Sequence, residues 1–378
     1  MKRKIIVSGI GPGKGGVGRL INNIIVKKSE QIDILFKPEK RSIKNLYYKK
    51  QYFNIIIEYL KRVRFFVLYF PKIWLLSKRE VILLHPQALG YNLFFRIVKR
   101  NKVYFYVMDN GFFCVKSYNN NPNTGNECFK CIGSSANIDE NCNPFPINYE
   151  RNKNISYLKK LKEISPSLIF LAQNKLQKKV LENHFGEGIK CTIIGMDTGE
   201  FSNIVYEEKS FPVKYDIVFH GANLSAKGIN YVIDLSLLLP QFSFAIPFSK
   251  NEVESYLGFN IYNENLKFIP CSWESGLKNM VISSRLVLNP SLWSAPIEGA
   301  LLKSYLYNPN LATVKTDFGF EKEFSKLSNH LRLSEDLIIA SKQIIEYLNQ
   351  EKRDNKNEFM NRHQIISGVL SNFDRSLF

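Results

Sequence analysis

A glycine-rich loop near the start of the chain holds the first residues that could do chemistry. The segment KGGVGR, residues 14–19, follows the apolar run IIVSGI, and Gly15 and Gly16 allow a ligand to approach the backbone closely. One class of ATP-binding loop also opens with Lys-Gly-Gly-Val-Gly, but it continues with Lys and then Ser or Thr. Here Arg19 and Leu20 follow, and leucine cannot ligate magnesium. The loop therefore predicts backbone amides that stabilise negative charge on a ligand such as a phosphate.

His85 and Asp109 stand at the ends of two other strand-like runs, VILLHP and VYFYVMD. The carboxyl ends of parallel strands meet at one edge of a sheet, so we expect both residues beside the glycine loop. There they could orient a polar substrate through hydrogen bonds or give weak acid–base assistance. His85 precedes Pro86 and has a second interpretation as a structural histidine.

Four of the six cysteines cluster in an irregular stretch, residues 111–154, that is rich in Asn, Gly and Pro. Their spacing is C-x13-C-x2-C-x10-C, and the residues are Cys114, Cys128, Cys131 and Cys142. The cluster is compatible with a structural zinc site, although the stronger pattern has two C-x2-C pairs. Reduced thiols that pack the loop are the alternative, and a disulfide is disfavoured in a cytosolic chain. We therefore do not assign a metal.

The elements that must position these residues alternate between short apolar runs and helical segments. Such alternation is typical of α/β domains with parallel sheets, and 378 residues suffice for two of them. We predict an N-terminal Rossmann-like domain, residues 1–205, with the cysteine-rich insert 111–154. A polar linker, 202–215, leads to a second Rossmann-like domain, residues 206–378. The last helix, about 358–373, completes the second domain or packs back on the first.

The charge of the chain is concentrated in its first hundred residues. They hold 22 Lys and Arg against 5 Asp and Glu, a net charge of +17 within a total of +18. A Lys-rich genome bias explains part of the charge but not its asymmetry. Residues 59–79 interleave six basic residues with Phe, Tyr, Trp and Leu, a mixture that can lie in an anionic headgroup interface. The alternative is an ordinary helix that packs on a sheet and has a basic outer face.

Several partners and locations are not expected from the sequence. No run reaches the about 18 uninterrupted apolar residues of a spanning helix, and no signal peptide is predicted. No helix-turn-helix, zinc finger or RNA-binding aromatic signature is visible, so nucleic acid is not expected to be a partner. We expect a cytoplasmic protein that is peripherally associated with the inner face of the cell membrane.

Four segments, in the correct order, resemble the retaining GT-B glycosyltransferases of the family 4 type. They are GGVGR at 15–19, the strand, helix and MDTGEF turn within 167–201, DIVFHGANLSAKG at 216–228, and the PSLWSAPIEGALLKSYLYNPNLATV stretch within 285–314. The resemblance implies two Rossmann-like domains that face a cleft. It also implies transfer of a sugar from a nucleotide-diphosphate sugar with retention of configuration and without a metal or other cofactor.

The resemblance also shows where this sequence departs from the family. Lys227 matches the lysine that neutralises the donor diphosphate, but the arginine expected five positions earlier is Ala222. The two glutamates that the family places eight apart correspond to Ala295 and Lys303. The family's usual donor contacts are therefore only partly present.

Nearby residues could replace the missing donor contacts. Glu298 precedes a predicted helix that begins at Gly299, and it could bind a sugar or ribose hydroxyl. Lys303 could restore positive charge if it faces the phosphates. The alternatives are that Glu298 only complements the helix dipole and that Lys303 lies on a solvated face. By the same resemblance, His85 and Asp109 orient the sugar.

The sequence as a whole predicts a glycosyltransferase that acts on a lipid-linked glycan or polysaccharide acceptor in bacterial O-antigen or capsule synthesis. Its expected catalytic residues are Asp109, His85 and Glu298. Its expected donor-binding residues are Gly15, Gly16, Lys227, Gly299 and Lys303. The alternative is a catalytically degenerate GT-B protein that serves as a glycan-binding or scaffold subunit, as Ala222, Ala295 and Lys303 suggest.

Overall fold

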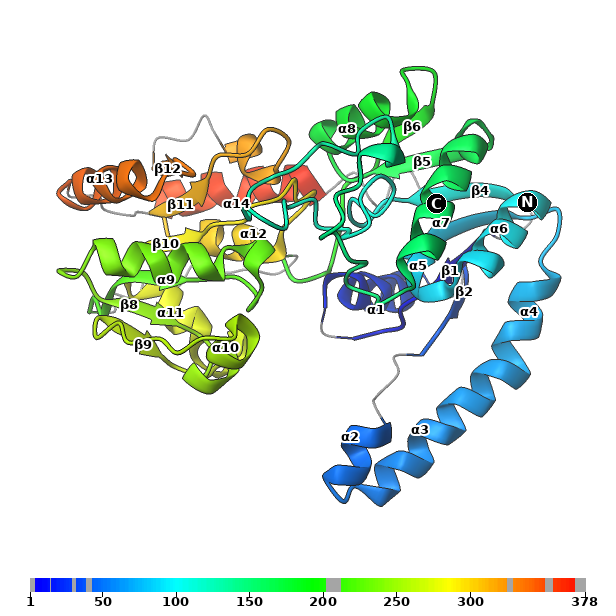
Figure 1. The fold of residues 1–378 in the computed structure, drawn as a ribbon, viewed down its shortest axis with the longest axis horizontal. Coiled ribbons are helices and arrows are strands. Elements are labelled where there is room, and N and C mark those ends of the chain that lie inside the picture. The colour runs from blue at the N-terminus through cyan, green and yellow to red at the C-terminus, as the bar shows by residue number, and fades with distance from the viewer. Residues whose placement is uncertain are drawn as a thin grey trace.

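Two six-stranded parallel sheets with flanking helices form the two halves of the molecule (Figure 1). The computed structural model describes residues 4–13, 15–28, 32–38, 43–201, 212–324, 329–350 and 356–370. The predicted α/β class and the two parallel sheets are confirmed. The predicted domain boundary at 205/206 and most of the linker lie outside the described residues.

The first sheet has the strand order β2-β1-β3-β4-β5-β6. Its strands are β1 (Ile5–Ser8), β2 (Asp33–Phe36), β3 (Glu80–Leu84), β4 (Lys102–Tyr106), β5 (Leu168–Ala172) and β6 (Lys190–Ile193). The helices of this half, apart from residues 43–75, are α1 (Gly16–Lys28), α5 (Pro86–Leu89), α6 (Tyr91–Arg100), α7 (Arg151–Ile164) and α8 (Lys175–Phe185). The central strands are continuous apolar runs because helices cover both faces of the sheet. In β1, for example, every residue is buried.

The second sheet has the strand order β12-β11-β10-β7-β8-β9. Its strands are β7 (Tyr215–Phe219), β8 (Phe244–Ile246), β9 (Leu266–Phe268), β10 (Ser284–Asn289), β11 (Leu311–Val314) and β12 (His330–Leu333). Its helices are α9 (Ile229–Leu238), α10 (Lys250–Leu257), α11 (Lys278–Ile282), α12 (Gly299–Tyr307), α13 (Leu337–Leu348) and α14 (Lys356–Leu370). The last helix, α14, contacts α12 and buries Phe359 and Ile366.

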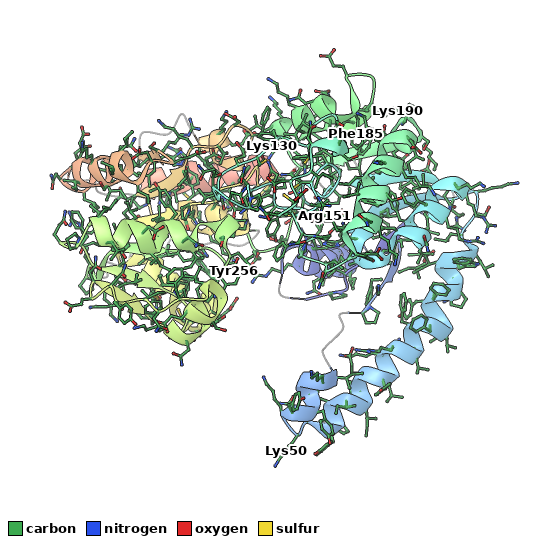
Figure 2. All side chains as sticks on the ribbon, viewed as in Figure 1. Lys50, Lys130, Arg151, Phe185, Lys190 and Tyr256 are labelled. Carbon is green, nitrogen blue, oxygen red and sulfur yellow. The ribbon has the colours of Figure 1, made fainter. Side chains whose placement is uncertain are left out.

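A helical arm leaves the first half between β2 and β3 and projects away from both sheets (Figure 1). It consists of α2 (Ile43–Tyr48), α3 (Tyr52–Arg64), a π-helical turn (Phe65–Tyr69) and α4 (Phe70–Leu75). Lys50 lies at its tip (Figure 2). Phe53 is 74% exposed and Leu60 is 62% exposed, so α3 does not pack on the sheet as an ordinary surface helix would. Within the described residues, no helix is long and apolar enough to cross a bilayer.

The cysteine-rich insert connects the two halves. Its irregular part ends at Glu150 rather than at 154, because Arg151 begins α7. Asn119 and Ser294 exchange two hydrogen bonds of 3.0 Å, one from the Ser294 backbone N–H to Asn119 Oδ1 and one from Asn119 Nδ2 to Ser294 Oγ. The ring of Tyr118 lies 4.3 Å from the ring of Trp293 in the second half.

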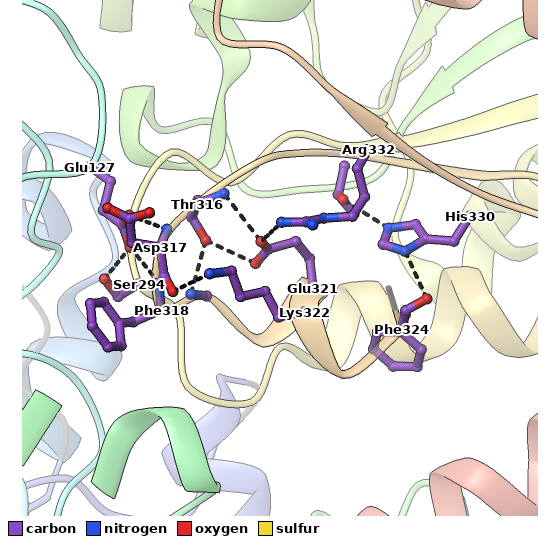
Figure 3. Close-up of polar contacts among 12 residues, drawn as sticks. Glu127, Ser294, Thr316, Asp317, Phe318, Glu321, Lys322, Phe324, His330 and Arg332 are labelled. Carbon is purple, nitrogen blue, oxygen red and sulfur yellow. Dashed lines mark hydrogen bonds and ion pairs between the residues drawn. The ribbon is translucent and has the colours of Figure 1, made fainter. Parts of the chain in front are cut away.

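A partly buried carboxylate of the same insert also binds the second half (Figure 3). Glu127 accepts hydrogen bonds from Ser294 Oγ and from the backbone N–H groups of Asp317, at 2.5 Å, and Phe318, at 3.3 Å. Burial raises the pKa of Glu127, and these three donors oppose that rise. The insert therefore joins the two halves through polar contacts, of which the Asn119–Ser294 pair is buried.

Truncating Asn119 to alanine is expected to destabilise the protein by about 1–3 kcal/mol, because the buried Ser294 N–H then loses its acceptor. Urea unfolding followed by circular dichroism measures the change. Asn123→Ala, an exposed site in the same insert, is the matched control and should change stability little. Equal stability of the two variants would show that the Asn119–Ser294 contact does not hold the halves together.

Candidate active site

The carboxyl edges of the two sheets face each other. Asn174, just after β5, donates a 2.9 Å hydrogen bond to the carbonyl of Pro296, in the loop that follows β10. The neighbouring Gln173 accepts a 3.2 Å bond from the backbone N–H of Ile297. These edges are where parallel α/β sheets bind ligands, and they carry the residues singled out in the sequence.

His85 and Asp109 lie together, as predicted from their strands. His85 Nε2 is 3.9 Å from Asp109 Oδ2, and Asp109 Oδ1 accepts a 2.9 Å bond from the Gly111 N–H. His85 caps α5 in a left-handed conformation, φ 52°, and its Nδ1 accepts from the Ala88 N–H at 3.4 Å. This bond leaves the Nε2–H directed at the carboxylate. Burial lowers the pKa of His85 and raises that of Asp109, while each opposes the shift of the other.

The glycine loop presents open backbone at the start of α1. A side chain built on Gly15 or Gly16 would meet no atom within 4 Å, so neither glycine is needed for packing. The first turn of α1 contains no acidic residue of its own that would compensate the positive end of the helix. Gly18, by contrast, would place a Cβ 2.6 Å from the backbone of Gly13. Lys14 lies outside the described residues.

Lys227 and Glu298, both predicted site residues, form an ion pair with each other. Each side chain is 13% exposed. Glu298 also accepts a 2.8 Å bond from Ser291 Oγ and makes no side-chain capping bond to α12. The ammonium of Lys227 lies 4.7 Å from the centroid of the Trp293 ring and 5.6 Å from that of Tyr118. Two aromatic rings thus lie beside Lys227.

Lys303 is buried, not on a solvated helix face. It is 5% exposed, and its Nζ lies 2.6 Å from Glu200 Oε1, which also binds Arg19 Nη1 at 2.8 Å. The ammonium of Lys303 stands 4.9 Å from the centroid of the Trp273 ring. Arg19 belongs to α1 and Lys303 to α12, which Gly299 begins. One carboxylate therefore holds together cations from the two helices that follow the facing edges.

His220, at the end of β7, supports this arrangement. Its Nδ1 makes a 2.8 Å hydrogen bond with Ser304 Oγ, and its ring stacks on Trp273 at 5.2 Å. Burial and the charge of Lys303 lower the pKa of His220 to about 3, so the ring stays neutral near pH 7. A neutral histidine can lie beside Lys303 without repelling it.

The departures from the family pattern are also visible in the structure. Ala222 is exposed and Ala295 is buried, and neither can supply charge or a hydrogen-bonding side chain. Sequence reasoning missed Glu200, Trp293 and Trp273. Glu200 and Trp293 lie inside quoted segments, MDTGEF and PSLWSAP, but no local pattern distinguished them from their neighbours.

The clustered cysteines pack among apolar side chains. Cys114, Cys131 and Cys142 are buried in one hydrophobic cluster with Phe112 and Phe113. Burial raises the pKa of Cys131 to about 11, and it raises the pKa of the other two buried thiols as well. Across the described ranges, no three His, Cys, Asp or Glu side chains form a group that could hold a metal ion. The six cysteines are free in the structure, and structural zinc stays an untested hypothesis.

Solved glycosyltransferase structures have a similar architecture. The chain aligns with sucrose-phosphate synthase from Thermosynechococcus elongatus at 10% identity and a TM-score of 0.60, over 100% of this chain and 96% of that one. It aligns with HepE from Anabaena in complex with UDP at 11% identity and a TM-score of 0.57, over 99% and 98% of the two chains. The match to the GtfA/B complex has 16% identity, a TM-score of 0.49 and 83% coverage, and the chain spans only 59% of that protein. No protein-family model and no curated protein matches the sequence.

These similarities show the fold. The chain is a two-domain α/β protein with the GT-B architecture, in which two parallel sheets present their carboxyl edges to each other.

Proposed function

We propose that this protein is a glycosyltransferase that binds a nucleotide-sugar donor between the two facing edges. The observation that carries the proposal is the carboxylate of Glu200, which joins Arg19 of α1 to Lys303 of α12. These cations and the open amides at Gly15 and Gly16 are the groups that a donor diphosphate needs. A neighbouring GT-B structure contains UDP, so UDP-sugars are the first donors to test.

In this proposal, the donor diphosphate takes over cations that carboxylates now hold. Lys227 and Lys303 are paired with Glu298 and Glu200 in the structure. A diphosphate offers more negative charge and more acceptor oxygens than one carboxylate, so it can replace these partners. Glu298 is then free to bind a hydroxyl of the sugar.

Asp109 and His85 act on the acceptor side of the reaction. The neutral His85 donates through Nε2, and Asp109 accepts, so the pair can orient a sugar hydroxyl between them. The leaving phosphate can receive the acceptor proton, which makes a strong external base unnecessary for retention of configuration. The reaction is of the family 4 type and needs no metal.

The acceptor is a lipid-linked glycan of the kind used in O-antigen or capsule synthesis. The exposed aromatic and basic arm supports association with an anionic membrane surface, because apolar side chains enter the headgroup region while Lys and Arg meet lipid phosphates. The protein would then work at the inner face of the cell membrane.

A calorimetric titration with UDP, GDP, CDP, ADP and dTDP tests the donor site directly. We expect saturable binding of one nucleotide, UDP first, and then slow hydrolysis of the matching sugar nucleotide without an acceptor. Absence of binding at millimolar concentration of every nucleotide would overturn the enzyme assignment.

A second candidate is a glycan-binding or scaffold subunit that has lost catalysis. Two observations favour it. The ion pair with Glu298 neutralises the charge with which Lys227 would bind phosphate, and the small Ala222 and Ala295 lack the contacts that the family makes to the donor. This protein would bind glycan without hydrolysing any donor, and Lys227→Ala would leave glycan binding intact.

A further inference from the structure

An aromatic cavity lies at the root of the helical arm, outside the proposed donor site between the two sheets. Its volume is about 610 Å³, and it is lined by the arm on one side and by α6, α7 and the insert on the other. Eight of the lining residues are aromatic, among them Phe65, Phe70 and Trp74 of the arm and Tyr91, Tyr149 and Tyr157 opposite them. Ligand pockets typically occupy about 300–1,000 Å³, so the cavity can take a substantial molecule.

The aromatic wall is built from rings stacked on one another. Tyr91 lies 3.9 Å from the ring centroid of Tyr157 and 4.7 Å from that of Tyr149. Asn154 donates a 2.7 Å hydrogen bond to the hydroxyl of Tyr91 and fixes this ring. On the arm, Phe70 stacks on Trp74 at 5.6 Å. A wall of this kind favours a hydrocarbon chain over a polar ligand.

Lysines are the charged side chains of the cavity. The lining, all of it within the described ranges, includes Lys37, Lys153 and Lys160 but no Asp or Glu. Lys160 lies 4.4 Å from the centroid of the Phe95 ring, and Lys153 is paired at 2.6 Å with the exposed Glu150 just outside the lining. An apolar interior with lysines around it suits an amphiphile that has a phosphate head.

The cavity is continuous with the exposed face of the arm and close to the acceptor residues. Phe66 belongs to the lining and is itself 58% exposed, so the apolar surface continues from the arm into the cavity. On the inner side, Leu89 ends α5, the helix that His85 caps. One turn of helix, about 6 Å, separates the two ends of α5. Tyr149 also binds this segment, through a 2.7 Å bond to the Gln87 carbonyl.

We propose that this cavity binds the hydrocarbon chain of the lipid-linked acceptor, with the lipid phosphate at Lys153 and Lys160. The inference rests on the proposed function and adds the location of the acceptor's lipid part. The glycan attached to the phosphate then extends along α5 toward His85 and Asp109. A bilayer phospholipid offers similar chemistry, but only an acceptor lipid explains why the cavity lies beside the acceptor residues.

Titration with farnesyl phosphate, a short isoprenoid phosphate, tests the cavity without requiring activity. Ser156 is exposed on α7 and lines the cavity, so Ser156→Trp should fill its mouth and weaken binding about tenfold or more. Asn152→Trp, exposed on the same helix but outside the lining, is its control. Lys153→Glu with Lys160→Glu should weaken binding at least about tenfold by repelling the phosphate. Lys175→Glu with Lys179→Glu on α8 matches that change in net charge.

Loss of farnesyl phosphate binding in both cavity variants, with binding kept in both controls, would support the proposal. Binding that none of the variants changes, or no saturable binding at all, would overturn it. If phosphatidylglycerol vesicles bind the wild type but Ser156→Trp affects neither probe, the arm contacts bilayer lipid and the cavity assignment is wrong. UDP titration of each variant separates the two claims, because donor binding does not involve the cavity and also shows that the variant is folded.

Discussion

Replacing Lys227 with glutamine is expected to weaken UDP binding roughly tenfold to a hundredfold. The variant removes a cation that would contact the diphosphate, and a hydrogen bond to a charged group contributes about 1.5–3 kcal/mol. Lys227 is held between Trp293 and Tyr118 with little exposure, so solvent screens its charge less than that of a surface lysine. Calorimetric titration of the wild type and the variant gives the ratio of dissociation constants.

Two further variants test whether a loss of UDP binding in Lys227→Gln is specific to this lysine. Lys250→Gln removes the same charge from an exposed site on α10 and should leave UDP binding unchanged. Glu298→Gln removes the carboxylate that now holds Lys227, so UDP binding should stay equal or tighten while sugar transfer falls. If Lys227→Gln binds UDP as well as the wild type, Lys227 is not a donor ligand. If Glu298→Gln weakens UDP binding, Glu298 does not compete with the phosphates.

Replacing Asp109 with asparagine is expected to lower kcat/KM for sugar transfer roughly a hundredfold, without changing the UDP dissociation constant. Asparagine keeps an oxygen for the Gly111 N–H but loses the negative charge opposite His85 Nε2. Positioned groups that assist proton movement contribute about 10²–10⁴ in rate. Steady-state transfer assays give the rate effect, and UDP titration shows whether the donor site is intact.

The pH dependence of transfer distinguishes a role in chemistry from a structural one. Burial raises the pKa of Asp109, so the carboxylate becomes protonated at a higher pH than a free aspartate, and kcat/KM should fall as the pH is lowered. Burial lowers the pKa of His85, so the ring stays neutral near pH 7 and its titration should not change kcat/KM there. In Asp109→Asn this acid limb should disappear. An unchanged acid limb in that variant would assign the titration to another group.

The sequence alone determined the alternation of strands and helices and therefore the fold class. Strands that are buried on both faces appear in the sequence as short apolar runs. IIV at the start of β1 and LVLN in β10 are examples. The sequence also placed the glycine loop, His85 and Asp109 at one edge, because parallel strands end together. Its apolar pattern does not mark β12 or α10, since β12 has only Leu333 buried and α10 only Val253.

Only the tertiary structure decided what the charged residues of the site do. Lys227 pairs with Glu298, and Lys303 shares Glu200 with Arg19, through contacts between segments far apart in the sequence. No periodicity records such pairs. The first forms where the loops after β7 and β10 of one sheet meet, and the second depends on how the two sheets pack. The same holds for the insert, which binds the second half through Asn119, and for the arm. The pattern of the arm fits both a packed helix and an exposed one. In the structure most apolar side chains of α3, such as Phe53 and Leu60, are exposed.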